Sequence, residues 1–237
     1  MEKGLELDSV TFTFPGKKLP FFESLSFSCT PGMLHFIQGK NGSGKSTLFR
    51  IIRGALNPHE KLTGTFSLNG RKRALLNNMV DTELTQQITT VVQDADDMLA
   101  PDFTVEQNLQ CAQLSPYPNL RSLPVAHKIT TVMNKFTIDL ASRVGNLSGG
   151  QRQILAVLMA LQRPTSVLLL DEPTAALDPK NADMIMSCLQ EISRELDLVM
   201  LIISHDKELV RTYSKGQYFE IYEDERGVRS IHTVNNQ

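Results

Sequence analysis

A run of residues near the start of the chain has the types and spacing that hold a chain of phosphates. In order they are Gly39, Lys40, Asn41, Gly42, Ser43, Gly44, Lys45, Ser46 and Thr47, which fit the phosphate-loop pattern G-x-x-x-x-G-K-[ST]. The glycines allow a tight turn in which successive backbone N–H groups surround an anion. Lys45 would then reach the outer phosphates, and the hydroxyl of Ser46 would ligate Mg²⁺. The sequence therefore predicts a site for a nucleoside triphosphate.

The segments on both sides of this loop support that prediction. Residues 33–37 form a mostly apolar run, which is typical of a buried strand. After the loop, apolar residues recur at helical spacing as far as Leu56, and Pro58 marks the end of the helix. The loop thus lies between a strand and a helix, the context that supports such a motif. The positive end of the helix dipole would also attract an anion.

Two adjacent carboxylates follow a second apolar run. Residues 167–170 have the pattern of a strand buried on both faces, and Asp171 and Glu172 come directly after it. In phosphate-loop enzymes a carboxylate at this position anchors Mg²⁺. Its neighbour could be the general base, or could orient the water that attacks the γ-phosphate. The alternative is an acidic turn, but the phosphate loop and the apolar strand together favour the catalytic interpretation.

A histidine follows a third apolar run. Residues 198–203 have the pattern of another buried strand, and His205 lies just beyond it. Apolar residues at helical spacing predict a helix within 184–196, so the two strands are expected to be parallel. Ligands of parallel sheets bind beyond the carboxyl ends of the strands. His205 could therefore donate a hydrogen bond to the γ-phosphate; the alternative is a structural histidine.

Ser148, Gly149, Gly150 and Gln151 begin another predicted helix. Ser148 is a good N-cap, and apolar residues continue to Leu161. Two glycines in the first turn weaken a helix by about 1 kcal/mol each relative to alanine. That cost is understandable if bare N–H groups must approach an anion, whereas the alternative is a capped helix without a ligand. One triphosphate could be held by both helix starts of one molecule, or by one helix start from each of two.

The composition limits the classes of protein to which this chain could belong. Hydrophobic residues make up 41% and charged residues 21% of the 237 residues, which is ordinary for a globular chain. The formal net charge of −2 gives no reason to expect nucleic acid as a partner. Cys29, Cys111 and Cys188 are far apart and indicate neither a disulfide framework nor a zinc site. We find no signal peptide and no apolar run of about 18 residues, so another chain would supply any membrane span.

The other segments indicate additions to the α/β fold. Strand patterns occupy residues 5–14, 25–29, 65–68 and 88–93, and the first three are expected to be antiparallel. The basic run 71–73 follows the hairpin signal at 69–70 and is expected to be a solvated loop tip. Residues 94–145 are polar and rich in turns, with spacing for short helices at 105–114 and 126–136. This segment indicates an inserted helical subdomain. The charged tail after Tyr222 gives no prediction.

The motifs together resemble those of the nucleotide-binding subunits of ATP-binding cassette (ABC) transporters. The run from Leu147 to Gln151 matches the signature sequence of that family at every position. Gln93 resembles the glutamine of the Q-loop, residues 175–178 the D-loop, and residues 204–206 the region of the switch histidine. Ala175 departs from the serine that is frequent in the D-loop. The motifs occur in the family's order over residues 5–222.

The resemblance implies a residue that contacts adenine. Phe14 lies 25 positions before Gly39 (39 − 14), about where the family places an aromatic residue, usually tyrosine, against the base. A phenylalanine would keep the stacking and lose the hydroxyl. Phe12 is the alternative. The resemblance also implies that Asp178 of the D-loop belongs to the nucleotide-binding residues.

The implied fold is α/β: a P-loop NTPase (RecA-like) core with an antiparallel β-subdomain and an inserted α-helical subdomain. Residues 1–237 would be a single ATP-binding domain. Residues 1–93 and 163–237 would form the α/β core with its β-subdomain, and residues 94–162 the helical subdomain that carries the signature.

The implied activity is hydrolysis of ATP with Mg²⁺. Glu172, His205 and Gln93 would be catalytic, and Gln93 would contact Mg²⁺ together with Ser46 and Asp171. In the implied assembly, a head-to-tail homodimer, each ATP lies between the phosphate loop of one chain and the signature of the other. Closure on ATP would drive an integral membrane permease through the segment between Gln93 and Gly145.

The leading prediction is a bacterial importer ATPase that works with a separate substrate-binding protein. It would lie in the cytoplasm, peripheral on the cytoplasmic face of the cell membrane. The sequence is similar to cassettes of amino-acid-type uptake systems. The alternatives are a cassette of lipoprotein export or cell-wall remodelling, and a soluble cassette ATPase without a role in transport.

Overall fold

The computed structural model describes residues 4–76, 82–113, 133–134, 136–175 and 177–235, which form a mixed sheet with helices. The strands are β1 (Leu5–Thr13), β2 (Phe22–Cys29), β3 (Met33–Gln38), β4 (Lys61–Leu68), β5 (Arg71–Leu76), β6 (Ile88–Val91), β7 (Val167–Asp171), β8 (Val199–Ile203), β9 (Gln217–Glu223) and β10 (Arg229–Asn235). The helices are α1 (Lys45–Ile52), α2 (Thr82–Thr85), α3 (Val105–Ala112), α5 (Gly149–Ala160), α6 (Pro179–Leu196) and α7 (Lys207–Tyr213). Two 3₁₀ turns are η1 (Ala95–Met98) and η2 (Val144–Asn146).

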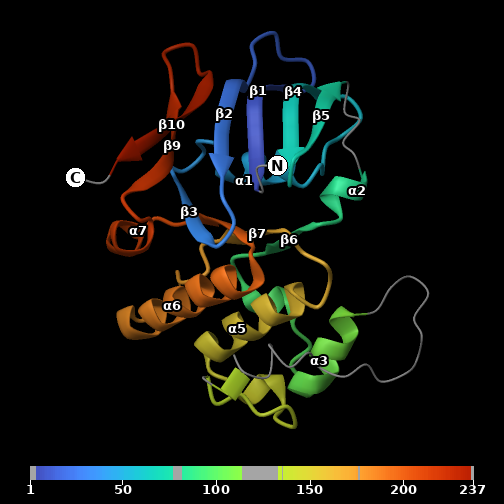
Figure 1. The fold of residues 1–237 in the computed structure, drawn as a ribbon, viewed down its shortest axis with the longest axis vertical. Coiled ribbons are helices and arrows are strands. Elements are labelled where there is room, and N and C mark those ends of the chain that lie inside the picture. Colours follow the sequence, from blue (N-terminus) through green and yellow to red (C-terminus); the bar gives the residue numbers. More distant parts are fainter. Residues whose placement is uncertain (1–3, 77–81, 114–132, 135, 176, 236–237) are drawn as a thin grey trace.

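Parallel strands connect the two halves of the molecule (Figure 1). β3, β8, β7 and β6 are neighbours in that order, and each pairing is parallel. Ile203 at the end of β8 pairs with Ile37 of β3 on one side and with Asp171 of β7 on the other. The phosphate loop, the two carboxylates and His205 lie at or just after the ends of these strands, so the predicted site residues lie at one edge of the sheet. The parallel sheet expected from the sequence is confirmed.

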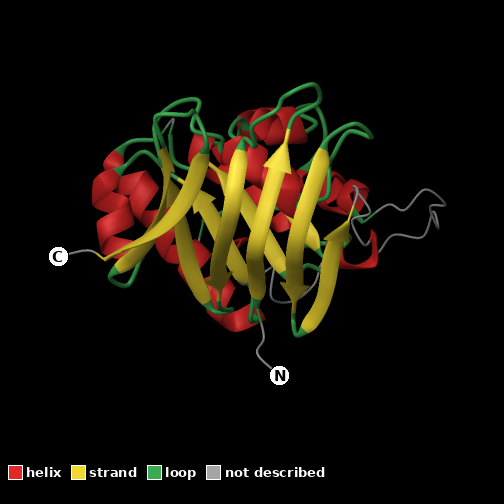
Figure 2. Cartoon of the chain, turned by 90° about the horizontal axis from the view of Figure 1, so that it is seen from above, coloured by secondary structure: helices red, strands yellow, loops and turns green. Residues whose placement is uncertain are grey.

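Both faces of the parallel strands are buried, as their continuous apolar sequences predict. Leu168 and Leu170 of β7 belong to one core cluster, with residues of α5 and α6. Val167 and Leu169 belong to a second cluster, with residues of α1 and the antiparallel strands. This division follows from the alternation of side chains along a strand. Seen from above, the strands lie in front and most of the helices behind them (Figure 2).

Antiparallel strands extend the sheet, as predicted for the first third of the chain. β5, β4, β1 and β2 are neighbours in that order and pair antiparallel. The basic run 71–73, expected to be a loop tip, instead lies in β5 and pairs with β4. That expectation was wrong because a turn signal does not tell whether the chain beyond it pairs again. Exposed basic side chains on an edge strand also discourage pairing with other chains.

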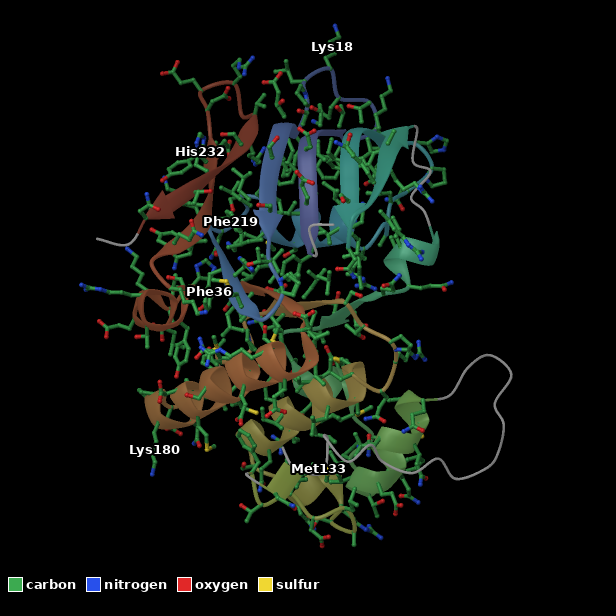
Figure 3. All side chains as sticks on the ribbon, viewed as in Figure 1. Lys18, Phe36, Met133, Lys180, Phe219 and His232 are labelled. Atoms are coloured by element: carbon green, nitrogen blue, oxygen red, sulfur yellow. The ribbon has the colours of Figure 1, made fainter. Side chains whose placement is uncertain are left out.

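The charged tail, which gave no prediction, forms a hairpin. β9 and β10 are antiparallel, and β9 also pairs in parallel with β3 at residues 37–38. β10 joins β2 where Arg229 pairs with Phe22. The hairpin therefore connects the antiparallel and parallel parts of the sheet. In Figure 3, Phe36 of β3 and Phe219 of β9 lie within the molecule, whereas Lys18 and Lys180 project outward.

Short helical pieces follow β6. Helix α3 covers most of the helix expected at 105–114, and its N-terminus has a capping box formed by Thr104 and Gln107. The expected helix at 126–136 lies almost entirely outside the described residues. Helix α1 ends at Ile52, before the expected Leu56, because Gly54 takes a left-handed conformation with φ of 68°. Within the described residues, none of the helices has the length and apolarity to cross a membrane.

A partly buried ion pair secures the end of α1. Arg50 contacts the two carboxylate oxygens of Glu60 at 2.6 and 2.7 Å. The backbone N–H of Asn57 donates to the same carboxylate at 2.8 Å. Glu60 is 2% exposed, so its charge depends on these partners.

We expect Arg50→Ala to lower the free energy of unfolding by about 1.5–3 kcal/mol, because the buried carboxylate of Glu60 would lose its charged partner and keep only the hydrogen bonds from Asn57. Urea unfolding at neutral pH, followed by circular dichroism, measures the change. Arg53→Ala is the matched control, since Arg53 is exposed, and should change stability by less than about 0.5 kcal/mol. Equal stabilities of the two variants would contradict the prediction.

Candidate nucleotide-binding site

A hollow of about 440 Å³ lies at the carboxyl edge of the parallel strands. The phosphate loop contributes Asn41, Gly42, Gly44, Lys45, Ser46 and Thr47 to its lining. The ends of the other strands contribute Gln93, Asp171, Glu172 and His205, and the segment between β1 and β2 contributes Phe14 and Phe21. The fold therefore brings together predicted residues that are far apart in the sequence.

Lys45 begins α1, and its amine closes the phosphate loop. Nζ donates to the carbonyl oxygens of Gly39, at 2.8 Å, and Lys40, at 3.2 Å. Burial lowers the pKa of this amine, and the nearby carboxylates of Glu172 and Asp171 partly offset that effect. A phosphate oxygen would be a stronger partner for the cation than these neutral carbonyls. The geometry thus provides a partly desolvated cation at the position where the outer phosphates are predicted.

Gly44 is required by the geometry of the loop. Its φ is 103°, which ordinary side chains rarely adopt. A Cβ atom at this position would lie 2.6 Å from a ring carbon of Phe21. The ring of Phe21 therefore packs directly against the backbone of the phosphate loop.

The adjacent carboxylates have different environments. Burial raises the pKa of Asp171, and Glu172 raises it further, whereas Lys45 and His205 lower it. Oε1 of Glu172 lies 3.3 Å from Nε2 of His205. Glu172 has a φ of 47°, in the left-handed region, which costs a residue with a side chain roughly 1–2 kcal/mol. This strain occurs at the residue that the sequence predicts to act on the attacking water.

The oxygen donors in the hollow fit Mg²⁺. Ser46, Asp171 and Gln93 line it together and offer a hydroxyl, a carboxylate and an amide oxygen. Mg²⁺ prefers such ligands and usually keeps waters and substrate phosphates in its shell. Burial, and then the neighbouring Glu172, raise the pKa of Asp171, so its negative charge is unfavourable here, and a divalent cation would relieve it.

The second predicted helix start lies outside this hollow. Oγ of Ser148 accepts a hydrogen bond from the backbone of Gln151, and Oε1 of Gln151 accepts one from the backbone of Ser148. These bonds form a capping box at the start of α5. Cβ atoms added at Gly149 and Gly150 would meet no side-chain atom closer than 3.6 Å, an ordinary contact. Packing among the described residues therefore does not require glycine at either position.

A smaller hollow of about 210 Å³ lies between the start of α5 and the chain just beyond β6 and β7. Gln93 and Glu172 line both hollows, and Gly149 lines the smaller one. Nε of Arg152 in α5 forms an ion pair with Asp96 in η1 at 2.7 Å. The start of α5 is therefore attached to the turn that follows Gln93.

The structure also places the residues implied by the resemblance. Phe14 lines the hollow, whereas its alternative Phe12 is fully buried in the core. Asp178 caps α6, because its side chain accepts hydrogen bonds from the backbones of Lys180 and Asn181 at 3.1 Å. Its contact with nucleotide stays a prediction. Sequence reasoning missed Phe21, for which the only signal is an aromatic residue just before β2.

Comparisons with known proteins agree with this geometry. The family described as ABC transporter matches residues 22–175. The chain is 32% identical over 213 residues to the tyrosine transport ATP-binding protein of Clostridioides difficile, which covers 85% of this chain and 82% of that protein. It is 30% identical over 217 residues to a phosphonates import ATP-binding protein of Nostoc sp., with 89% and 80% covered.

A solved structure supports the same assignment. It is a dimeric ATP-binding cassette in a post-hydrolysis state with ADP and phosphate bound. Its identity to this chain is 25% and its TM-score is 0.69, with 98% of this chain and 99% of that chain covered. The fold is thus that of a P-loop NTPase of the cassette type. The chain belongs to the ABC transporter family, whose ATP-binding members are ATPases that power transport.

Asp171→Asn should stabilise the nucleotide-free chain at neutral pH. Since the pKa of Asp171 is raised in the fold, the native state binds the proton more tightly than the unfolded state. Stability is therefore lost as pH rises from the ordinary aspartate pKa through the raised value. Asparagine does not ionise, so the variant should unfold at a higher temperature above this window and have no such advantage below it.

Thermal unfolding from about pH 4 to about pH 8 tests this prediction, since roughly 1 kcal/mol moves the midpoint by about 2–4 °C in a chain of this size. Asp178→Asn is the control with the opposite sign. Hydrogen bonds from the Asn181 backbone and side chain lower the pKa of Asp178, so its carboxylate stabilises the fold at neutral pH. A lower midpoint for Asp171→Asn at neutral pH would contradict the argument.

Proposed function

We propose that this chain is the ATP-hydrolysing subunit of a bacterial importer and that it works as a head-to-tail homodimer with Mg-ATP at each contact. The observation that carries the proposal is one hollow in which the phosphate loop and its lysine face two carboxylates and a histidine. Residues 1–93 and 163–237 would form the nucleotide-binding core, and residues 94–162 the helical subdomain with the signature.

The proposed roles follow from the positions of the side chains. The backbone of residues 39–47 would surround the phosphates, and Lys45 would exchange the loop carbonyls for phosphate oxygens. Mg²⁺, when bound, would neutralise charge on the β- and γ-phosphates. Glu172 would accept a proton from the attacking water. His205, whose Nε2 lies 3.3 Å from Glu172 in the chain without nucleotide, would donate its N–H to the γ-phosphate once ATP is bound.

The start of α5 supports an ATP shared between two chains. Ser148 and Gly149 are exposed and lie outside the hollow that contains the phosphate loop. Glycines in the first turn cost about 1 kcal/mol each, and packing within the described residues does not call for them. Close approach by a γ-phosphate held on a second chain would account for Gly149, which is exposed, whereas Gly150 is buried. This favours the second of the two arrangements that the sequence left open.

The role in transport is supported by the relatives. The names of two of them refer to tyrosine transport and to phosphonate import. We therefore propose an integral membrane permease as the partner, with a separate substrate-binding protein, and a position on the cytoplasmic face of the membrane. An amino-acid-type substrate agrees with the tyrosine relative. The differing substrates of the two relatives indicate that the permease and the binding protein, rather than the ATPase, select the molecule that is carried.

Lys45→Ala should weaken binding of Mg-ATP by about 10- to 100-fold, the effect of losing a hydrogen bond from a charged donor of about 1.5–3 kcal/mol. Hydrolysis should fall with it. Calorimetric titration and a phosphate-release assay measure the two effects. Lys61→Ala is the control, because Lys61 is exposed on β4. Unchanged binding and turnover in the Lys45 variant would exclude the assignment of the loop.

Glu172→Gln should reduce hydrolysis by about 100-fold or more while ATP still binds, because the proton acceptor is lost and the phosphate loop is intact. Since ATP would bridge two chains, the variant should become dimeric with Mg-ATP and stay monomeric with Mg-ADP or without nucleotide. Light scattering at several protein concentrations measures the mass.

Gly149→Asp in the Glu172→Gln background provides the control for this assembly. A carboxylate at the start of α5 would face the phosphate and should restore the monomer, while ATP still binds to the phosphate loop. A Glu172→Gln protein that holds ATP and remains monomeric at every concentration would argue against a shared nucleotide.

A further inference from the structure

The aromatic side of the nucleotide hollow contains a ring that no motif predicted, and a cation lies over that ring. Phe21 makes edge-on contacts with Phe14 and with Phe22, with ring centroids 4.9 Å apart in each pair. The guanidinium carbon of Arg229 lies 4.0 Å from the centre of the Phe21 ring. This distance is well within the range of a cation–π interaction. Arg229 comes from β10 and lines a second hollow together with Phe14 and Phe21. Among the described residues, the C-terminal hairpin therefore contacts the nucleotide hollow through the Phe21 ring and does not line it.

Arg229 is held firmly over this ring. Its backbone N–H donates to the carbonyl of Phe21 at 3.0 Å. Nη2 donates to Glu223 at 2.8 Å, Nη1 donates to the carbonyl of Gly227 at 2.7 Å, and the side chain is only 15% exposed. Among the residues that the structure describes, the buried Nε finds no hydrogen-bond partner, although a buried donor normally has one. The guanidinium is therefore oriented toward the ring at the expense of one of its own donors.

The ring of Phe21 forms part of the wall that a ligand in the nucleotide hollow would contact. Together with Phe14 it lines both the phosphate-loop hollow and a second hollow of about 430 Å³, so the two rings separate these spaces. The ring of Phe21 also packs against Gly44, where an added Cβ would lie 2.6 Å away. A shift of Phe21 would thus alter the aromatic wall of the hollow, which lies beside the phosphate loop.

We propose that Phe21 is a second base-binding ring beside Phe14 and that Arg229 is the positioning residue that holds it. The C-terminal hairpin is then part of the nucleotide site. The ligand chemistry is a planar base that is attached to a triphosphate and lies against the aromatic wall. This inference depends on the proposed function, because it requires the triphosphate to occupy the adjoining phosphate loop.

Binding of Mg-ATP and of Mg-tripolyphosphate to the full chain, measured by calorimetry, separates base recognition from phosphate recognition. Arg229→Gln should weaken Mg-ATP by about three- to tenfold, less than the full loss of a base–aromatic contact, because the ring is no longer held against the base, and should leave Mg-tripolyphosphate unchanged. Phe21→Val should weaken Mg-ATP at least as much. The double variant should bind Mg-ATP no more weakly than Phe21→Val alone, because Arg229 acts through the ring.

Arg226→Gln is the matched control on the same hairpin. The guanidinium of Arg226 bonds with Asp224 and Glu23 rather than with a ring, so this variant should bind both ligands as the wild type does. Thermal unfolding without ligand shows whether each variant is folded. Arg229→Lys keeps a cation but not the planar group, and should show a smaller loss that is again confined to Mg-ATP. It replaces Arg229→Gln if that variant does not fold.

Three results would overturn the inference. They are unchanged affinity for Mg-ATP when Arg229 is replaced, an equal loss for Mg-ATP and Mg-tripolyphosphate, and additive losses in the double variant. A wild-type chain that binds neither ligand would instead overturn the proposed function, and this inference with it. Binding of Mg-ATP by the wild type thus distinguishes a failure of the inference about Phe21 and Arg229 from a failure of the proposed function.

Discussion

The parallel register of β3, β8 and β7 is the constraint on which the candidate site depends. Ile203 pairs with Ile37 on one side and with Asp171 on the other, so three strands end at the same level. A slip of one residue would turn every side chain of the slipped strand to the opposite face of the sheet. Asp171 would then exchange places with an apolar neighbour that belongs in the core. Backbone hydrogen bonds, rather than contacts among the polar side chains, thus bring the phosphate loop, the carboxylates and His205 together.

Without a ligand, this edge of the sheet holds charges in unfavourable surroundings. Burial lowers the pKa of Lys45 and raises that of Asp171, so both ionised forms are disfavoured. Glu172 adds a left-handed backbone conformation at the same strand end. The two apolar clusters on either side of the parallel strands stabilise the fold enough to maintain these features. Binding of a metal-bound triphosphate would compensate the charges, which couples occupancy of the site to stability.

Much of this arrangement could be predicted because its signals are local. The phosphate loop is a continuous motif, and strands buried on both faces have continuously apolar sequences. The contact between Phe21 and Arg229 could not be predicted, because it joins residues 208 positions apart (229 − 21) whose local sequence has no motif. Apolar and polar residues alternate only loosely over residues 5–14. The structure explains this, because β1 pairs irregularly with its neighbours around Ser9, whose φ is 53°. Such irregularities depend on the partner strands and leave no clear local signal.

The ion pair between Arg152 and Asp96 has an electrostatic consequence. It attaches the start of α5 to the turn after Gln93, yet the two side chains are 29% and 59% exposed. Ion pairs so exposed contribute only about 0–1 kcal/mol, and dissolved salt screens them further. The ion pair therefore adds only a small contribution to the apolar packing of Ala95, which lies in the same core cluster as residues of α5. Raising the ionic strength would weaken this ion pair while hardly affecting the buried sheet.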